Sequence, residues 1–454
     1  MKRLENSQSG LTVIVLLSLI ISACSNPSNI QDKSADLHQP EIVEQLIIDS
    51  VWAANGVEFD LKTEGDMQFV AYFDRNRMMS VASRKTDSKI WTKKVLPNQL
   101  MWDSHNYVRL GIDKQGYIHV SGNMHVHPLA YFRSANPFDV TSMEDVNRMV
   151  GTDEDSVTYP NFFLDKKGDL MFSYRSGTCG NGNILVNLYN PEKNQWERYL
   201  EKSLFEGVEA DDDRAAYHHW VKDSNGDFHF VWMWRWTPMV ETSHHICYAS
   251  TPDLKNWKNA AGATVTLPFR PDDPTVLVDG TPSMGGMHNS RFRIILTKGG
   301  EPVIGYLKYD EEGLTQLYLA KFINNEWVIK KISTGAFMSI GGQFHFAGIS
   351  DDGLLVIDWK TEKGEEGRYT IDLETFEHTD KMAVIQPKYP ANLNKKLTGN
   401  PDLNVRIAYD TGRESLDGYL YVIKYEAAHG GFSQHAPKEI PEGPLSPLVL
   451  MKIK

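Results

Sequence analysis

Short stretches of alternating apolar and polar residues run through the chain from about residue 45 onward. Gly, Asp or Asn closes most of these stretches, and no long run has the spacing of an amphipathic helix. Alternation with a period of two is typical of strands with one buried face, and the closing residues are typical of turns. The pattern therefore predicts an all-β protein.

An Asp-x-x-Gly turn followed by an alternating, aromatic-rich strand recurs along this region. The clearest copies begin at Asp113, Asp165 and Asp223, about 55 residues apart, a spacing that accommodates one four-stranded propeller blade. Looser copies begin near Lys298 and Asp351. With 454 residues, the chain is long for one globular core, so a repeat architecture is favoured. We expect a single β-propeller of about seven blades over residues 45–454. A pair of β-sandwiches is the alternative, and it explains the repeated turn less well.

The first residues follow the pattern of an export signal. Lys2 and Arg3 precede an apolar run over 11–21 that is too short to span a bilayer stably, and Ser22-Ala23-Cys24 follows. This order is similar to a bacterial lipoprotein signal, which implies removal of residues 1–23, a lipid on Cys24 and a tether over 24–44. An ordinary secretory signal with a chance cysteine is the alternative. We expect attachment to the bacterial cell envelope, at the outer membrane, the cell surface or the periplasmic face.

Net charge and cysteine content narrow the function classes. The formal net charge of −12 argues against a general nucleic-acid binder, because no basic excess is present to neutralise phosphates. A few Arg residues in a cleft can still attract an anionic ligand at short range. Without Cys24, Cys179 and Cys247 are the remaining cysteines, so we expect no disulfide framework. We expect two buried free thiols, and a single bridge between them is the alternative.

Histidines gather where predicted strands end, at His105, His125, His127, His218, His219, His244 and His245. Such imidazoles suit proton transfer near neutral pH, whereas an isolated His is more often structural. Together with Tyr and Arg, they permit β-elimination of a uronic acid. That reaction needs a cation for the carboxylate, a base for the C5 proton and an acid for the oxygen leaving C4. Arg suits the first role because its planar fork matches a carboxylate.

Six segments, taken in order, resemble the BNR-4 propeller group, which includes ulvan lyases of polysaccharide lyase families 24 and 25 and related rhamnosyl-glucuronate lyases. The resemblance covers residues 50–360 approximately, and the segments are 105–113, 122–125, 131–134, 158–162, 172–177 and 232–235.

This resemblance implies a set of site residues. Arg175 is expected to neutralise the substrate carboxylate. His105, His125 and Tyr159 are expected to divide proton abstraction and leaving-group protonation, without an assignment of base against acid. Tyr217 is expected to assist or to position the substrate.

Three further residues, Arg235, His244 and Arg291, are candidate contacts to an acidic sugar, although each can equally be structural. Some members of the group carry a metal beside the cleft, so a structural metal ion at His244, His245 and Cys247 is possible. The expected additional Cys ligands are absent from the sequence. We therefore expect no catalytic metal and no required cofactor.

The expected activity is β-elimination on a rhamnose- and glucuronate-containing, ulvan-type polysaccharide or its oligosaccharides. The partner is thus an anionic glycan, and the leaving group is a sugar chain or, in an oligosaccharide dehydratase, water. A rhamnosyl-glucuronate hydrolase is one alternative, although hydrolysis normally uses paired carboxylates. A non-catalytic, glycan-binding surface lipoprotein is the other.

Overall fold

The fold is built almost entirely from strands. The computed structural model describes residues 39–207, 214–333, 342–361, 363–413 and 415–454. These residues contain no α-helix, and their short 3₁₀ segments are Val140–Ser142, Val240–Thr242, Pro274–Val276, Ala391–Asn394 and Ser433–His435. No helix in this part of the chain has the length and apolar character that crossing a membrane requires. The all-β prediction is confirmed.

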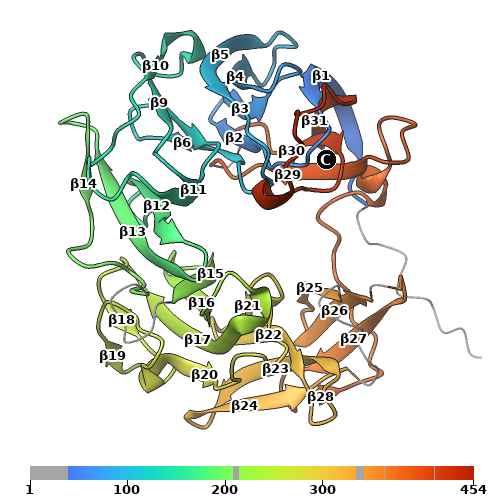
Figure 1. The fold of residues 1–454 in the computed structure, drawn as a ribbon. Coiled ribbons are helices and arrows are strands. Elements are labelled where there is room, and N and C mark those ends of the chain that lie inside the picture. Colours follow the sequence, from blue (N-terminus) through green and yellow to red (C-terminus); the bar gives the residue numbers. More distant parts are fainter. Residues whose placement is uncertain (1–38, 208–213, 334–341, 362, 414) are drawn as a thin grey trace, which may run out of the picture. The chain divides into compact units, whose positions relative to one another are not determined.

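The strands form antiparallel sheets, most of them four-stranded (Figure 1). The first two sheets along the chain are β2 (Asp60–Glu64), β3 (Met67–Phe73), β4 (Met78–Lys85) and β5 (Thr92–Gln99), and then β6 (Val108–Ile112), β7 (Ile118–Gly122), β9 (Tyr131–Ser134) and β10 (Met143–Asp145).

A larger sheet of eleven strands follows. It contains β8 (His125–His127), β11 (Val157–Leu164), β12 (Leu170–Thr178), β13 (Asn181–Asn190), β14 (Gln195–Arg198), β15 (Ala215–Lys222), β16 (Phe228–Arg235), β17 (Ser243–Thr251), β18 (Trp257–Lys258), β19 (Thr264–Val265) and β20 (Leu277–Asp279). Within it, β11–β14 and β15–β18 are two antiparallel sets joined by one parallel pair, Gly182 with Ala215.

The remaining sheets come from the last third of the chain and the first described strand. They are β21 (Phe292–Leu296), β22 (Pro302–Tyr309), β23 (Thr315–Ile323) and β24 (Glu326–Lys331); β25 (Gln343–Ile349), β26 (Leu354–Lys360), β27 (Glu366–Asp372) and β28 (Glu377–His378); and β29 (Asn404–Tyr409), β30 (Leu420–Ala427), β31 (Leu445–Ile453) and β1 (Ile42–Trp52).

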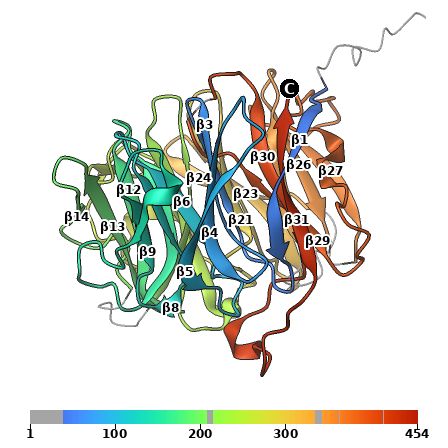
Figure 2. The same cartoon turned by 90° about the horizontal axis from the view of Figure 1, so that it is seen from above.

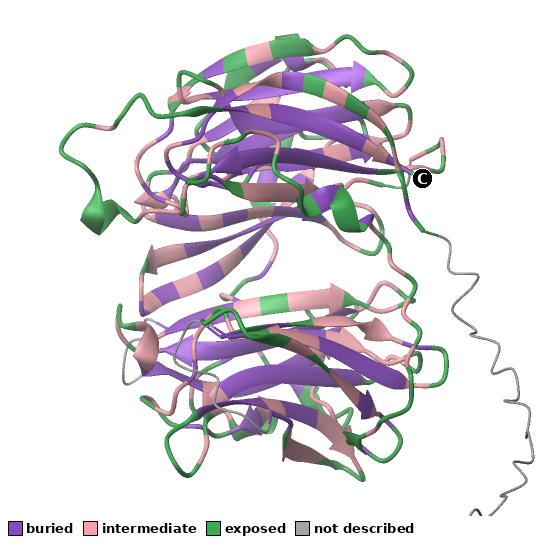
Figure 3. Ribbon diagram, turned by 90° about the vertical axis from the view of Figure 1, so that its right-hand side faces the viewer, coloured by how far each residue is buried: buried purple, intermediate pink, exposed green. Residues whose placement is uncertain are grey.

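Successive sheets pack side by side through their first strands, as Figures 1 and 2 show. β29 contacts β2, β2 contacts β6, β6 contacts β11, β15 contacts β21, and β21 contacts β25. Buried residues lie mainly in the strands and exposed residues mainly in the loops (Figure 3). The buried side chains are mostly apolar. This packing places loops from consecutive sheets next to one another.

The recurring Asp-x-x-Gly motif forms three turns, between β6 and β7, between β11 and β12, and between β15 and β16. The Asp113 carboxylate accepts hydrogen bonds from the backbone N–H groups of Gln115 (2.8 Å) and Tyr117 (3.0 Å), and Asp165 and Asp223 do the same in their turns. The glycines of the three turns, Gly116, Gly168 and Gly226, have φ values of 87°, 79° and 82°. The motif recurs because the aspartate satisfies turn N–H groups and glycine adopts this φ without strain.

The two ends of the described chain meet in one sheet, because β1 pairs antiparallel with β31 along most of its length. β1 begins at Ile42, so residues 42–44 of the expected tether belong to this strand. The predicted signal over 1–23, the predicted lipid site Cys24 and the tether as far as residue 38 lie outside the described residues.

Candidate active site

The five residues expected to carry the chemistry come together at the ends of neighbouring sheets. His105 precedes β6, His125 begins β8, and Tyr159, Arg175 and Tyr217 lie in β11, β12 and β15. Four of them line one cavity of about 600 Å³, which we call the site cavity, and the ring of His125 lies 4.4 Å from that of His105. The predicted residues are therefore brought into one site by the eleven-stranded sheet and the sheet that begins with β6.

Both histidines are oriented by one buried carboxylate, Asp103, which the sequence analysis did not single out. Asp103 lies 2.6 Å from Nδ1 of His105 and 2.9 Å from Nδ1 of His125, and it also accepts from the Ser433 N–H at 2.9 Å. Burial would raise the pKa of Asp103, but the hydrogen bonds from the two imidazoles hold it well below its usual range. With Nδ1 used in this way, Nε2 of His105 is left for substrate, whereas His125 also forms a hydrogen bond with Cys179.

His125 is the more strongly perturbed imidazole. Burial would lower its pKa, but hydrogen bonds to Asp103 and Cys179 outweigh that effect and raise the pKa to about 9. His125 therefore carries a proton at neutral pH.

Cys179 lies within the site and was expected only to be a buried thiol. Its Sγ accepts from Nη2 of Arg235 at 2.8 Å and lies 3.6 Å from the Tyr217 hydroxyl. Burial would raise the pKa of Cys179, but the hydrogen bond with His125 and the charge of Arg235 lower it to about 6. The site thus contains a thiolate held among cationic groups.

Tyr159 lies at an irregular point of β11. The register with β12 shifts between Thr158 and Asn161, and Tyr159 has a φ of 59°, unusual for an aromatic residue. Its ring centroid lies 5.7 Å from that of His105 and 4.9 Å from the guanidinium carbon of Arg175. Burial raises the pKa of Tyr159, and the charge of Arg175 offsets this only in part. The hydroxyl consequently keeps its proton at neutral pH.

Arg175 is fully buried, with 0% of its surface exposed. Its Nη1 donates to the Tyr217 hydroxyl at 3.3 Å, whereas Nε and Nη2 have no hydrogen-bond partner among the described residues. A buried guanidinium with two unused donors is costly unless a ligand supplies acceptors. The arrangement suits a carboxylate, which can accept two parallel hydrogen bonds from Arg.

The three additional predicted contacts differ in position. Arg235 belongs to the site, because it bonds Cys179 and lies over the Tyr217 ring at 4.5 Å. His244 is buried and does not line the site cavity. Its Nδ1 lies 3.1 Å from the backbone oxygen of Thr242. Burial lowers the pKa of His244 to about 4. Arg291 lines a neighbouring cavity rather than the site cavity.

Potential metal ligands were also expected at His244, His245 and Cys247. Among the described residues, the ligand atoms of these three do not gather into one group, and the Cys247 side chain packs in the apolar core. The donor atoms of Asp103, His105 and His125 do lie within 4.8 Å of one another. Hydrogen bonds between the carboxylate and the two imidazoles account for that grouping without an ion. Cys179 and Cys247 are both free, Cys247 buried as expected and Cys179 partly exposed.

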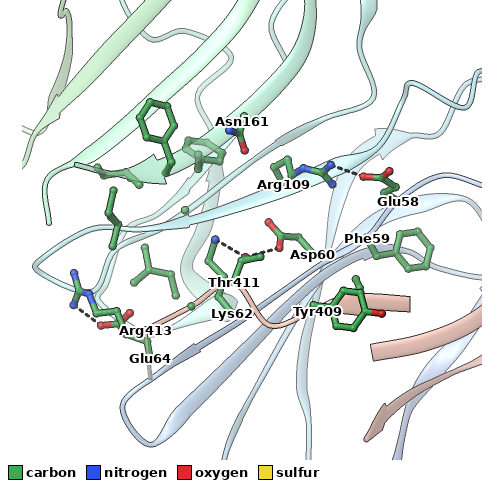
Figure 4. A pocket seen from close by; sticks show the side chains of 18 of the residues that line it. Glu58, Phe59, Asp60, Lys62, Glu64, Arg109, Asn161, Tyr409, Thr411 and Arg413 are labelled. Atoms are coloured by element: carbon green, nitrogen blue, oxygen red, sulfur yellow. Dashed lines mark hydrogen bonds and ion pairs between the residues drawn. The ribbon is translucent and has the colours of Figure 1, made fainter. Parts of the chain in front are cut away.

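A larger cavity of about 780 Å³ shares Glu58, Arg109, Asn161 and Trp220 with the site cavity. Figure 4 shows that several of its charged groups already have partners: Arg109 binds Glu58, Arg413 binds Glu64, and Lys62 donates to the hydroxyl of Thr411. None of the predicted His and Tyr residues lines it. We therefore regard the smaller site cavity as the reactive one, and we call the larger one the ion-paired cavity.

Comparisons with known proteins point to one group. A family model described as "BNR repeat-containing family member" matches residues 67–334. Among solved structures, the chain is similar to polysaccharide lyase Uly1, with a TM-score of 0.59 and 14% identity over 91% of this chain and 99% of that one. It is also similar to a PL25 ulvan lyase, with a TM-score of 0.57 and 14% identity over 84% and 93% of the two chains. A PL25 ulvan lyase bound to -[GlcA(1-4)Rha3S]- gives a TM-score of 0.56 at 13% identity, with the same coverage. No curated protein matches the sequence. At these identities the structural likeness establishes a shared fold.

Proposed function

Because the chain belongs to the BNR repeat-containing family, we propose that it is a lyase that cleaves a uronate-containing glycan by β-elimination. The observation that carries this proposal is Arg175, whose two unused donors lie buried beside two imidazoles and two tyrosines. A uronate carboxylate satisfies those donors. Its neutralisation makes the C5 proton acidic enough for a nearby base to remove.

The surrounding groups divide the remaining steps. His105 takes the C5 proton on Nε2, because its Nδ1 is bonded to Asp103. The electrons of the C5–H bond form the C4–C5 double bond as the C4–O4 bond breaks, and the protonated Tyr159 supplies the proton that O4 needs. Charged His125 and Arg175 stabilise the negative charge that develops on the carboxylate. Tyr217, which is bonded to Arg175, positions the guanidinium.

The substrate we propose is a glycan of glucuronate and rhamnose, polymeric or oligomeric. The fold shared with the ulvan lyases and the PL25 complex with -[GlcA(1-4)Rha3S]- support this choice. The leaving group is a sugar chain. In an oligosaccharide dehydratase it is water, and mass spectrometry of the products separates the two cases.

The test is to follow the ultraviolet absorbance of unsaturated uronate while the protein acts on ulvan and its oligosaccharides. Tyr159→Phe and Arg175→Ala should each lower kcat/KM by about 100-fold or more, because each removes one proton-transfer or charge-stabilising group. Matched controls are Tyr409→Phe and Arg413→Ala, which lie in the ion-paired cavity and should retain activity. New sugar ends without the absorbance would instead indicate hydrolysis, and binding without turnover would indicate a non-catalytic glycan binder.

We also propose that the sheets close as one seven-bladed propeller, with β1 and β31 completing the last blade. The pairing of β1 with β31 and the contacts between successive first strands support this closure. An experimental structure showing an open or differently numbered arrangement would contradict it.

A lipid anchor at Cys24 in the bacterial cell envelope remains our proposal for location, on the strength of the N-terminal sequence. Cys24→Ser should move the protein from the membrane fraction to the soluble fraction of cells that express the full chain. A wild-type protein recovered without lipid would contradict the anchor.

A further inference from the structure

The segment between β30 and β31 reaches the edge of the site cavity. It spans residues 428–444, and in Figure 2 it extends beyond the ends of the strands on the side where β8 lies. It brings an exposed aromatic residue, Phe432, against His105, which lines the site cavity. The family model ends at residue 334, so this segment adds to the site a residue that the model does not cover.

Hydrogen bonds on both sides of Phe432 fix its backbone. The N–H of Gly431 donates to the side chain of Asn55 at 2.7 Å, and the N–H of Ser433 donates to Asp103 at 2.9 Å. Asn55 and Asp103 are each 1% exposed, so both anchors belong to the buried framework of the fold. A ring whose backbone is held at both neighbouring residues is already in place before a ligand binds.

Two glycines before Phe432 allow the segment to approach the loop that precedes β6. A Cβ on Gly430 would lie 2.7 Å from Cβ of Ser104, and a Cβ on Gly431 would lie 2.8 Å from Nε1 of Trp102. A larger residue at either position would therefore push the segment away from this loop. The sequence of the segment thus accounts for the position of the Phe432 ring.

The Phe432 ring lies at the end of a row of contacts that begins at Arg175. The Arg175 guanidinium carbon lies 4.9 Å from the centroid of the Tyr159 ring, and that ring lies 5.7 Å from the imidazole of His105. The imidazole in turn lies 5.6 Å from the Phe432 ring. Among the described residues, Phe432 makes no other ring contact, and 42% of its surface is exposed. A uronate that binds Arg175 and is reached by His105 leaves Phe432 facing the sugar that follows it.

A phenyl ring suits the apolar side of a sugar. One face of a sugar ring presents C–H groups, which pack against an aromatic ring without needing hydrogen bonds. A 6-deoxy sugar has a methyl group where other hexoses have a hydroxyl. It therefore has one polar group fewer to lose from water when the phenyl ring covers it.

We propose that Phe432 binds the sugar next to the uronate by packing against its apolar face, and that it favours a 6-deoxy sugar at this position. This inference rests on the proposed function, because it takes the ligand of the site cavity to be a uronate within a glycan. Phe432 thereby contributes to the choice of glycan without taking part in proton transfer.

The test compares two ligands that differ in whether they reach Phe432. Methyl glucuronoside and an oligosaccharide of glucuronate and rhamnose are titrated by calorimetry into the Tyr159→Phe protein, in which turnover is suppressed. Adding Phe432→Ala should weaken oligosaccharide binding about tenfold and leave methyl glucuronoside binding unchanged. Phe432→Leu, which keeps apolar volume in the segment, should weaken oligosaccharide binding as well. Phe432→Tyr should keep most of the affinity because it keeps the ring.

Phe138→Ala is the matched control, because Phe138 is 41% exposed and does not line the site cavity. Unchanged oligosaccharide affinity in Phe432→Ala and Phe432→Leu would overturn the inference. An equal loss for both ligands would overturn it too, because the ring would then act by positioning His105 rather than by touching a second sugar. Wild-type turnover without unsaturated products would contradict β-elimination and leave the binding result intact.

Discussion

At the scale of single residues, Asp103 determines the state of both imidazoles. One buried carboxylate forms hydrogen bonds with Nδ1 of His105 and Nδ1 of His125. It therefore fixes the orientation of both rings and helps to raise the pKa of His125. Such a shared carboxylate explains how two histidines about twenty positions apart in sequence can differ in role. One carries a proton at neutral pH, and the other is proposed to receive one.

Replacing Asp103 with Asn tests this coupling. Loss of the carboxylate should lower the pKa of His125 from about 9 toward its ordinary value near 6.5. His125 would then be charged only in acid, so the alkaline limb of the pH profile of kcat/KM should move down by more than one pH unit. NMR titration of His125 gives the pKa directly. Asp139→Asn, which changes a partly exposed aspartate that caps a 3₁₀ turn, is the control. An unchanged alkaline limb would show that His125 charge does not govern the rate.

Cys179 should be an unusually reactive thiol. Its pKa of about 6 makes it largely thiolate at pH 7, whereas burial raises the pKa of Cys247, which serves as the internal control. Brief treatment with iodoacetamide at pH 7 should label Cys179 at least tenfold faster than Cys247, as read by peptide mass spectrometry. An acidic oligosaccharide bound in the site should slow the labelling. Equal labelling of the two cysteines would contradict the ionised thiol.

At the scale of strands, irregular positions place the reactive groups. Tyr159 occupies the register shift between β11 and β12, and Arg175 extends along β12 past Gly182 of β13. A Cβ on Gly182 would lie 2.9 Å from Cγ and 3.0 Å from Cδ of Arg175. Glycine is therefore needed at this point of β13 so that the arginine stem can lie against the sheet.

Gly182→Ala should displace Arg175 and lower kcat/KM about tenfold, because a displacement of a few tenths of an ångström misaligns the carboxylate contact. The thermal midpoint should fall by a few degrees, since a methyl group must be accommodated in packed surroundings. Gly399→Ala is the matched control, because its added Cβ would meet no atom within 4 Å. Full activity in Gly182→Ala would show that the arginine stem tolerates a shift.

Part of the strand pattern and of the candidate site follows from local features of the sequence. Alternation and the Asp-x-x-Gly turns predicted the strands correctly, because both are local effects of side-chain burial and turn hydrogen bonding. The family resemblance identified five candidate residues, and the fold brings them together in one site. The role of Asp103 and the place of Cys179 in the site were not predicted, because both depend on partners such as His125 and Arg235 that only the folded chain brings near. Arg291 was predicted to contact an acidic sugar, but it lines a neighbouring cavity rather than the site cavity.

At the scale of the whole molecule, the site depends on sheets contributed by distant parts of the chain. Ser433, close to the C-terminus, donates its backbone N–H to Asp103. Ser433 lies between β30 and β31 in the sequence, and β31 is paired with β30 on one side and β1 on the other. The pairing of β1 with β31 therefore links the ends of the chain to the carboxylate that orients the histidines.

This link predicts how the molecule responds to truncation. Removing β1 exposes the edge of β31 and deletes three buried side chains, Ile48, Val51 and Trp52, which are 3%, 0% and 4% exposed. Each such side chain contributes about 1.5–3 kcal/mol, so the loss is comparable with the whole stability of a typical domain. A chain that starts at residue 53 should therefore unfold at a much lower temperature and lose turnover, whereas a chain that starts at residue 39 should match the parent in both. Scanning calorimetry and the unsaturated-uronate assay measure the two effects. Equal thermal midpoints for the two truncated chains would show that the other sheets hold the site without the β1–β31 pairing.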